Sequence, residues 1–394
     1  MDRLRILRDL LLVFCLAANL IAPSDGSAKQ TGFEETSESL SREEAKSYME
    51  AEIKASLENI KTSRASEWKS KVIEMDGLKM KFEVLKFGEK PKTGHSLFIS
   101  MHGGGGAPAR VNEQQWRNQI RLYEPEEGIY LVPRAPTDTW NLWHQSHIDK
   151  FFGRIIEDAI AFEDVNPNRV YIMGYSAGGD GVYQLAPRMA DQLAAAAMMA
   201  GHPNDASPLG LRNIGFTLHM GGKDSAYKRN EVAAQWKEKL AELRESDPKG
   251  YAHEVTIHPD HGHWMKRDDA VAVPWMGKFT RNPLPEKIVW LQSGVTHDRY
   301  YWLAADKADQ KKNAKMVVSR EGNTFTIEET DQVEHVVIRL NDDMIDFSKP
   351  VTVKQGSHSD VFQVSRNKEV IQMTIAGRSD PGAVFSSQIR VKIK

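Results

Sequence analysis

Cysteine is almost missing from this chain of 394 residues, since Cys15 is the only one. A single cysteine excludes intramolecular disulfides, and its place near the N-terminus leaves no thiol for catalysis or for a metal site in the rest of the chain. Stability must then come from burial of apolar side chains. A hydrophobic content of 40% over this length supports one large core and a smaller one, which predicts two domains.

An excess of charge of either sign is also missing. The formal net charge is −2, and no dense stripe of Lys and Arg interleaved with aromatic residues occurs. Binding of nucleic acid depends on such basic surface, so nucleic acid is not an expected partner.

The N-terminal apolar run is too short to span a membrane. Leu10–Ala22 comprises thirteen uncharged residues, whereas a spanning helix needs about twenty. Three arginines precede this run, and small residues ending at Ala28 follow it. This pattern predicts a signal peptide over residues 1–28 and export to the periplasm or the extracellular space. A lipoprotein anchor at Cys15 is disfavoured because the bulky Phe14 precedes it.

The chain is organised around residues 169–179, which read as a strand, a sharp turn and the start of a helix. Gly174-Tyr175-Ser176-Ala177-Gly178 fits the pattern G-x-S-x-G. In this pattern glycines allow a tight turn that exposes a strained serine above a sheet, so Ser176 is the candidate nucleophile. A helix-capping serine in an ordinary loop is the alternative.

A glycine run supplies the context for this serine. His102-Gly103-Gly104-Gly105-Gly106 follows an apolar strand about seventy residues upstream. Glycines let backbone N–H groups approach the oxyanion of a tetrahedral intermediate, so Gly103, Gly104 and Ala177 are the predicted oxyanion donors.

A carboxylate and an imidazole then follow in the order that a serine hydrolase of this type requires. Asp224 ends a loop after the predicted strand 215–220, and His263 follows the predicted strand 253–257. His261 is the alternative base. His263 is preferred because a glycine before it frees the loop to turn, and a tryptophan after it packs the loop in place.

With these motifs, residues 71–284 resemble the α/β-hydrolase superfamily, and most nearly its secreted bacterial esterases of the polyhydroxybutyrate-depolymerase and feruloyl-esterase type. The resemblance implies an α/β fold, a mostly parallel twisted sheet flanked by helices, and a serine esterase that needs no cofactor and no metal. Acyl or hydroxycinnamoyl groups on polysaccharide are the first expected substrates, with hydroxyalkanoate oligomers next. The fold alone does not define the substrate.

Several residues near the predicted site are candidates for substrate contact. Trp140 and Trp143 lie in a loop after a predicted strand, His202 follows another strand, and Tyr175 precedes the serine. Each of these side chains has an alternative role in packing its own loop.

Outside residues 71–284 the pattern of apolar and polar residues changes. Residues 29–70 read as a polar linker and an amphipathic helix that braces the catalytic domain. Residues 285–394 read as short alternating strands, with one of them at 370–375, which predicts a β-sandwich resembling fibronectin-III or immunoglobulin domains. This domain is either a structural cap or a binding module, and its densest aromatic cluster is Trp290, Tyr300, Tyr301 and Trp302.

Three other functions stay open from the residues alone. A peptidase of the prolyl-oligopeptidase type uses the same order of triad residues, and a surface-binding or polymer-binding protein could keep a vestigial triad. A metal mechanism would use the segment that contains His258, Asp260, His261 and His263. The oligomeric state does not follow from the sequence.

Overall fold

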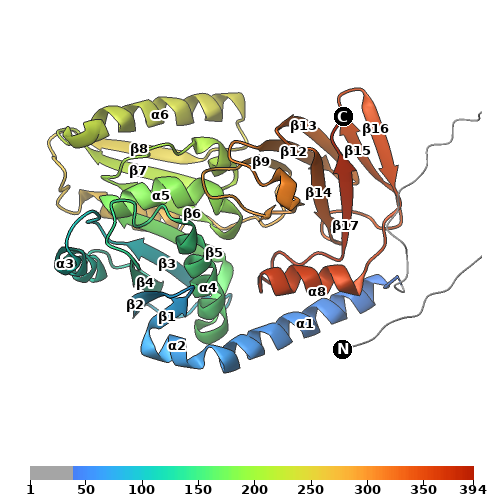
Figure 1. The fold of residues 1–394 in the computed structure, drawn as a ribbon, viewed down its shortest axis with the longest axis horizontal. Coiled ribbons are helices and arrows are strands. Elements are labelled where there is room, and N and C mark those ends of the chain that lie inside the picture. Colours follow the sequence, from blue (N-terminus) through green and yellow to red (C-terminus); the bar gives the residue numbers. More distant parts are fainter. Residues whose placement is uncertain (1–38) are drawn as a thin grey trace, which may run out of the picture. The chain divides into compact units, whose positions relative to one another are not determined.

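The computed structural model describes residues 39–394, so the predicted signal peptide lies outside the described residues. An eight-stranded sheet forms the centre of the catalytic region, in the order β1-β2-β4-β3-β5-β6-β7-β8 (Figure 1). The first three strands in this order pair antiparallel and the others pair parallel. The strands are β1 (Val72–Met75), β2 (Leu78–Phe87), β3 (His95–Met101), β4 (Gly128–Arg134), β5 (Val165–Tyr175), β6 (Ala195–Met199), β7 (Gly215–Gly221) and β8 (His253–His258).

Helices cover both faces of this sheet because its inner strands bury side chains on both sides. In β5, Val170 and Ile172 pack in one apolar cluster, whereas Tyr171 and Met173 pack in another. The first cluster includes side chains of four helices, and the second includes side chains of two. The four helices are α2 (Ala65–Ser70), α4 (Ser146–Glu163), α5 (Ala177–Arg188) and α6 (Arg229–Ser246), and the two in the second cluster are α3 (Ala109–Ile120) and α7 (Ala272–Met276).

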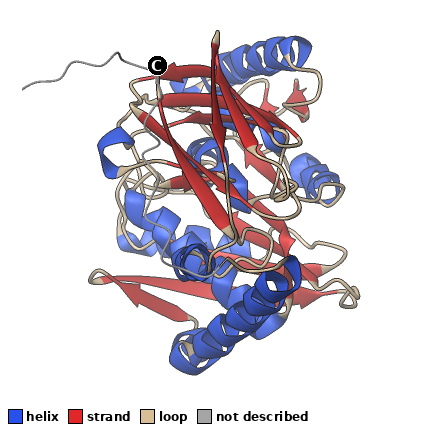
Figure 2. Ribbon diagram, turned by 90° about the vertical axis from the view of Figure 1, so that its right-hand side faces the viewer, coloured by secondary structure: helices blue, strands red, loops and turns tan. Residues whose placement is uncertain are grey.

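Two further sheets follow in the C-terminal part, as the alternating texture predicts (Figure 2). Every neighbouring pair in them is antiparallel except β13 with β15. One sheet contains β10 (Arg299–Tyr300), β11 (Leu303–Ala304), β14 (His335–Leu340) and β17 (Ser387–Lys392). The other contains β9 (Lys287–Leu291), β12 (Lys315–Glu321), β13 (Thr324–Asp331), β15 (Val351–Gln355) and β16 (His358–Phe362).

The predicted strand at 370–375 is wrong, because these residues belong to helix α8 (Lys368–Gly377). The side chain of Asn367 caps its first turn by accepting a hydrogen bond from the Val370 N–H at 3.1 Å. Ile371 and Ile375, one turn apart, are buried on its inner face. The aromatic cluster of the C-terminal part is also buried: Trp290, Tyr300, Tyr301 and Trp302 are at most 4% exposed. It therefore offers no exposed binding platform.

The predicted N-terminal helix is present as α1 (Arg42–Ser63), which continues into α2 (Ala65–Ser70). A capping box begins the helix, since the Ser41 hydroxyl accepts from the Glu44 N–H and the Glu44 carboxylate accepts from the Ser41 N–H. The helix lies against α4 and α8. No helix of the described chain, residues 39–394, has the length and apolar content needed to cross a membrane.

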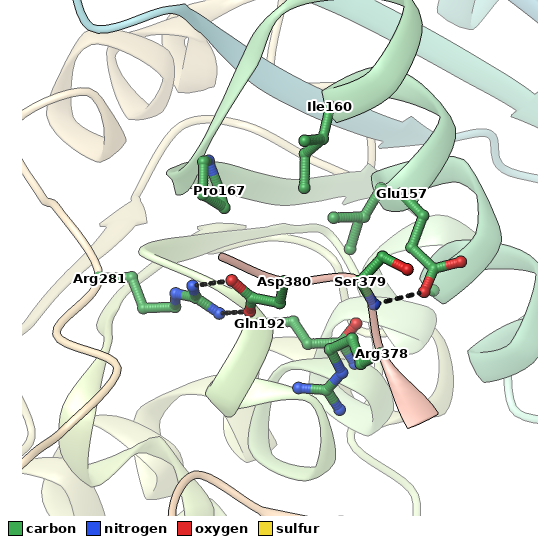
Figure 3. Close-up of a pocket in the computed structure, with 10 residues that line it drawn as sticks. Glu157, Ile160, Pro167, Gln192, Arg281, Arg378, Ser379 and Asp380 are labelled. Carbon is green, nitrogen blue, oxygen red and sulfur yellow. Dashed lines mark hydrogen bonds and ion pairs between the residues drawn. The ribbon is translucent and has the colours of Figure 1, made fainter. Parts of the chain in front are cut away.

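A polar junction joins the catalytic sheet region to the C-terminal part (Figure 3). The guanidinium of Arg281 binds both carboxylate oxygens of Asp380, at 2.6 and 2.9 Å, and Ser379 N–H donates to Glu157. The cavity between these side chains is about 10 Å³, which is roughly room for one water molecule. This junction therefore fastens the two parts together and is too small to bind a substrate.

Candidate active site

Ser176 sits in a strained turn between β5 and α5. Its backbone has φ 58° and ψ −122°, a conformation that non-glycine residues rarely adopt. The turn closes tightly, because a Cβ on Gly174 would come within 2.3 Å of the carbonyl oxygen of Gly178. Glycine at both ends thus allows the serine to project from the C-terminal end of the central parallel strand.

The structure brings Ser176, His263 and Asp224 together as the sequence predicts. His263 Nδ1 lies 2.6 Å from Asp224 Oδ2, and His263 Nε2 lies 2.9 Å from Ser176 Oγ. Asp224 is 3% exposed and follows β7, whereas His263 follows β8 and is largely exposed. With Nδ1–H donating to the carboxylate, Nε2 is left as an acceptor facing the serine hydroxyl.

Tyr175 holds the loop that carries His263. Its hydroxyl donates to the carbonyl of His263 at 2.6 Å and accepts from the N–H of Met265 at 2.9 Å. Burial raises the pKa of Tyr175, so the hydroxyl stays protonated at neutral pH. Tyr175 is 7% exposed, so its hydroxyl positions the loop and offers little surface to a substrate.

The glycine loop lies directly against the serine. A Cβ on Gly103 would come 3.2 Å from the Cβ of Ser176. Gly104 has φ +104°, and a Cβ there would meet the side-chain oxygen of Asn112 at 2.2 Å. Neither Gly104 nor Ala177 donates its N–H to an acceptor within residues 39–394, so both groups are free to bind an oxyanion.

Asn112 and Asp138 hold the glycine loop, and sequence reasoning missed both. Asn112 Oδ1 accepts from the Gly105 N–H at 2.8 Å, while its Nδ2 donates to Asp138 Oδ1 at 2.8 Å. Burial raises the pKa of Asp138, but hydrogen bonds from Asn112 and Arg134 outweigh it and hold this pKa below its usual value. An asparagine in the first turn after a glycine run is the only sequence signal for this support.

His102 is the buried start of the glycine loop. Its Nδ1–H donates to the Gly103 carbonyl at 2.6 Å, and its Nε2 accepts from the Ala135 N–H at 3.1 Å. Burial lowers the pKa of His102 to about 3, so the ring is neutral over the ordinary pH range. A neutral ring in this one tautomer links the loop to the end of β4.

The two tryptophans of the predicted substrate wall have different surroundings. Trp143 is fully buried, and its indole N–H donates to the His102 carbonyl at 2.9 Å, so its predicted contact with substrate is wrong. Trp140 is 63% exposed and lies against Gly106. His202 is half-buried at the end of β6, where its backbone N–H donates to Asp180.

The alternative base, His261, pairs with Asp268 and makes no hydrogen bond with the serine. Its Nε2 lies 2.7 Å from Asp268 Oδ2, and its ring packs edge-on against His258. The metal alternative is not assembled as the sequence suggested, because Asp260 pairs with Lys223 and His263 pairs with Asp224. His258, His261 and Asp268 instead lie close enough to share one ion.

The parallel sheet, the strained turn at Ser176 and the helices on both faces define the α/β-hydrolase fold. The chain therefore has the α/β-hydrolase fold, as its motifs predict. Residues 132–277 match the model of the Dienelactone hydrolase family.

Solved structures of esterases are similar to the chain over about half of its length. A thermostable esterase shares 16% identity over 53% of this chain and 62% of its own, with a TM-score of 0.40. A ferulic acid esterase shares 14% sequence identity, and the similarity covers 52% of this chain and 95% of that esterase, with a TM-score of 0.35. The feruloyl esterase module from Clostridium thermocellum shares 15% sequence identity, and the similarity covers 53% of this chain and 86% of that module, with a TM-score of 0.39. No curated protein sequence matches the chain significantly.

Proposed function

We propose that the protein is an exported serine hydrolase that cleaves carboxylic esters. Ser176 Oγ attacks the ester carbonyl as its proton passes to His263 Nε2, and Asp224 holds the imidazole in the required orientation. The histidine then gives this proton to the leaving alcohol. Water, deprotonated by the same nitrogen, releases the acid from the acyl-enzyme and restores the serine.

The observation that carries the proposal is the continuous hydrogen-bonded line from Asp224 through His263 to Ser176. Its serine is strained and half-exposed, and the glycine loop lies against it at Gly103. The backbone N–H groups of Gly103, Gly104 and Ala177, which are unpaired within residues 39–394, are the proposed donors to the negative oxygen of the tetrahedral intermediate. Export rests on the N-terminal signal sequence alone.

Labelling by a fluorophosphonate tests the mechanism. We expect the probe to modify Ser176, and we expect Ser176→Ala to abolish labelling while the melting temperature stays close to that of the wild type. A panel of nitrophenyl esters, feruloyl esters and peptide amides then tests the reaction class. Turnover of amides without turnover of esters would contradict the proposal, and so would labelling at another serine.

Exposed aromatic rings around the triad suggest how a substrate is held. Trp140, Tyr227 and Trp264 are 63, 78 and 51% exposed, and no other Phe, Tyr or Trp within residues 39–394 is exposed by more than about a third. Trp140 contacts the glycine loop, Tyr227 follows Asp224 by three residues, and Trp264 follows His263. We propose that these rings stack on ring-bearing groups of the ester.

Comparison of methyl cinnamate with methyl butyrate tests this role. We expect Trp140→Ala and Tyr227→Ala to raise KM for the ring-bearing ester about two- to tenfold, since one aromatic contact contributes roughly 0.5–1.5 kcal/mol. KM for the aliphatic ester should change little. Val361→Ala, which removes an exposed apolar side chain from β16, is the control. Equal effects on both esters would contradict the stacking role.

A further inference from the structure

A second group of potential ligand atoms lies in the C-terminal part, on different elements from the triad. Asp306 precedes a short 3-10 turn between β11 and β12, Asp309 is the last residue of that turn, and His335 begins β14. Each of these three residues presents one oxygen or nitrogen atom, and the three atoms lie within 4.8 Å of one another. Neighbouring ligands of one bound ion lie about 3 Å apart, since each metal–ligand bond is about 2 Å, so small side-chain movements would bring these atoms to an ion.

Asp309 has a buried carboxylate that the protein satisfies only in part. The residue is 1% exposed, and its Oδ1 accepts the Glu334 N–H at 2.7 Å. Its Oδ2 is buried and has no hydrogen-bond partner within residues 39–394. A buried carboxylate oxygen without a partner is costly, and such a group in a native protein calls for a bound ion or water.

The charges around Asp309 favour a cation over a water molecule. Asp306 Oδ2 binds the guanidinium of Arg390 at 2.6 and 2.8 Å, which offsets one of the two carboxylate charges. Within residues 39–394, Asp306 Oδ1 accepts no hydrogen bond. The imidazole of His335 neither donates nor accepts a hydrogen bond in the same part of the chain. Within the described chain, the three residues therefore keep one uncompensated carboxylate charge between them, and Asp309 Oδ2 stays without a partner.

We propose that Asp306, Asp309 and His335 bind a divalent transition-metal ion, Zn²⁺ or Mn²⁺. Two carboxylate oxygens and one imidazole nitrogen suit such borderline ions, with water completing the coordination. Ca²⁺ prefers six to eight oxygen ligands, which this site does not offer.

The ion would fasten the segment between β11 and β12 to the first residue of β14. These two segments are otherwise joined at this point by the hydrogen bond from Glu334 to Asp309. With no disulfide available in residues 39–394, a metal cross-link is one of the few devices that can close such a loop.

The group of His258, His261 and Asp268 is the weaker candidate for an ion, because its potential ligand atoms already have hydrogen-bond partners. His261 Nε2 pairs with Asp268, and His258 Nε2 lies 3.2 Å from His219 Nδ1. This histidine group supplies a matched control, since His261→Gln removes one of its potential ligands and leaves Asp306, Asp309 and His335 intact.

Metal binding by the full chain tests the proposal. After treatment with a chelator and addition of Zn²⁺ or Mn²⁺, we expect about one equivalent of metal by elemental analysis and a melting temperature raised by several degrees. Asp309→Asn and His335→Gln should each weaken binding at least tenfold and remove the rise in melting temperature. His261→Gln should keep both, and Ca²⁺ should have no effect.

The same measurements can overturn the proposal. It fails if neither ion raises the melting temperature, if the rise persists in both Asp309→Asn and His335→Gln, or if His261→Gln alone removes it. His335 lies at the start of a strand and is only half-buried, so His335→Gln decides the matter should Asp309→Asn not fold. Labelling of Ser176 by the fluorophosphonate is independent of this result.

Discussion

The hydroxyl of Tyr175 donates a 2.6 Å hydrogen bond to the carbonyl of His263 and so links the residue before the serine to the loop that carries the base. Tyr175→Phe removes this bond and keeps the ring. We expect kcat to fall about tenfold to a hundredfold with little change in KM, because the imidazole loses its alignment and not its contact with substrate. Kinetics on one activated ester measure this.

Tyr171→Phe is the matched control for that change. Tyr171 lies on the same strand, is buried, and donates its hydroxyl to the Phe279 carbonyl at 2.8 Å, away from the triad. The Tyr171→Phe variant should lose about as much stability as Tyr175→Phe but should keep the wild-type kcat. Equal losses of kcat in the two variants would assign Tyr175 a purely structural role.

The two histidines of one loop should differ sharply in their importance. His263 contacts Ser176, whereas His261 contacts Asp268. His263→Ala should lower kcat by about 10⁴- to 10⁶-fold, because the residues of a triad act as a unit. His261→Ala should lower it less than about tenfold. The reverse order, with both variants folded, would mean that the loop rearranges during catalysis.

Acid should destabilise the protein through the buried His219. Burial, with the neighbouring His258, lowers the pKa of His219 to about 4, against about 6.5 in the unfolded chain. Below pH 6.5 the unfolded chain binds a proton that the folded chain does not. The stabilisation is therefore complete above pH 6.5 and declines as the pH falls towards 4, by up to about 3 kcal/mol.

Urea unfolding at pH 7.5, 6 and 5 measures this effect. We expect His219→Gln to lose less stability between pH 7.5 and 5 than the wild type does. His358→Gln, at an exposed position of β16, should follow the wild type. Parallel pH profiles for wild type and His219→Gln would exclude His219 as the source of acid lability.

The ion pair between Arg281 and Asp380 should stabilise the junction of the two parts more than any surface pair. Both residues are at most 4% exposed. Asp380→Asn leaves a buried guanidinium without its counter-charge, which should cost about 3–5 kcal/mol in the free energy of unfolding. Asp360→Asn, which breaks an exposed pair with Lys394, should cost less than about 1 kcal/mol. Similar costs would show that the junction is hydrated.

The sequence predicted the triad because each of its residues follows a strand and the order along the chain is characteristic. It could not predict which neighbours hold these residues. Asn112 and Asp138 act through the folded loop, and the burial of Trp143 depends on the position of His102. These relationships join residues that are distant in sequence, and they have no local pattern.

The misassigned segment at 370–375 has a similar cause. Its β-branched residues favour a strand in isolation, but Ile371 and Ile375 are spaced by one helical turn and pack with Ala45 of α1. That partner lies more than three hundred residues away. Local propensity is overridden where a distant helix supplies the apolar surface.

This packing also sets an order of events during synthesis. Leu40 and Ala45 form one apolar cluster with Ile371, Ile375 and Val384, so its two halves come from opposite ends of the described chain. A ribosome makes the α1 half first and the α8 half last. The cluster therefore closes only after nearly the whole chain has been made, and until then the N-terminal end of α1 lacks the apolar surface that finally covers it.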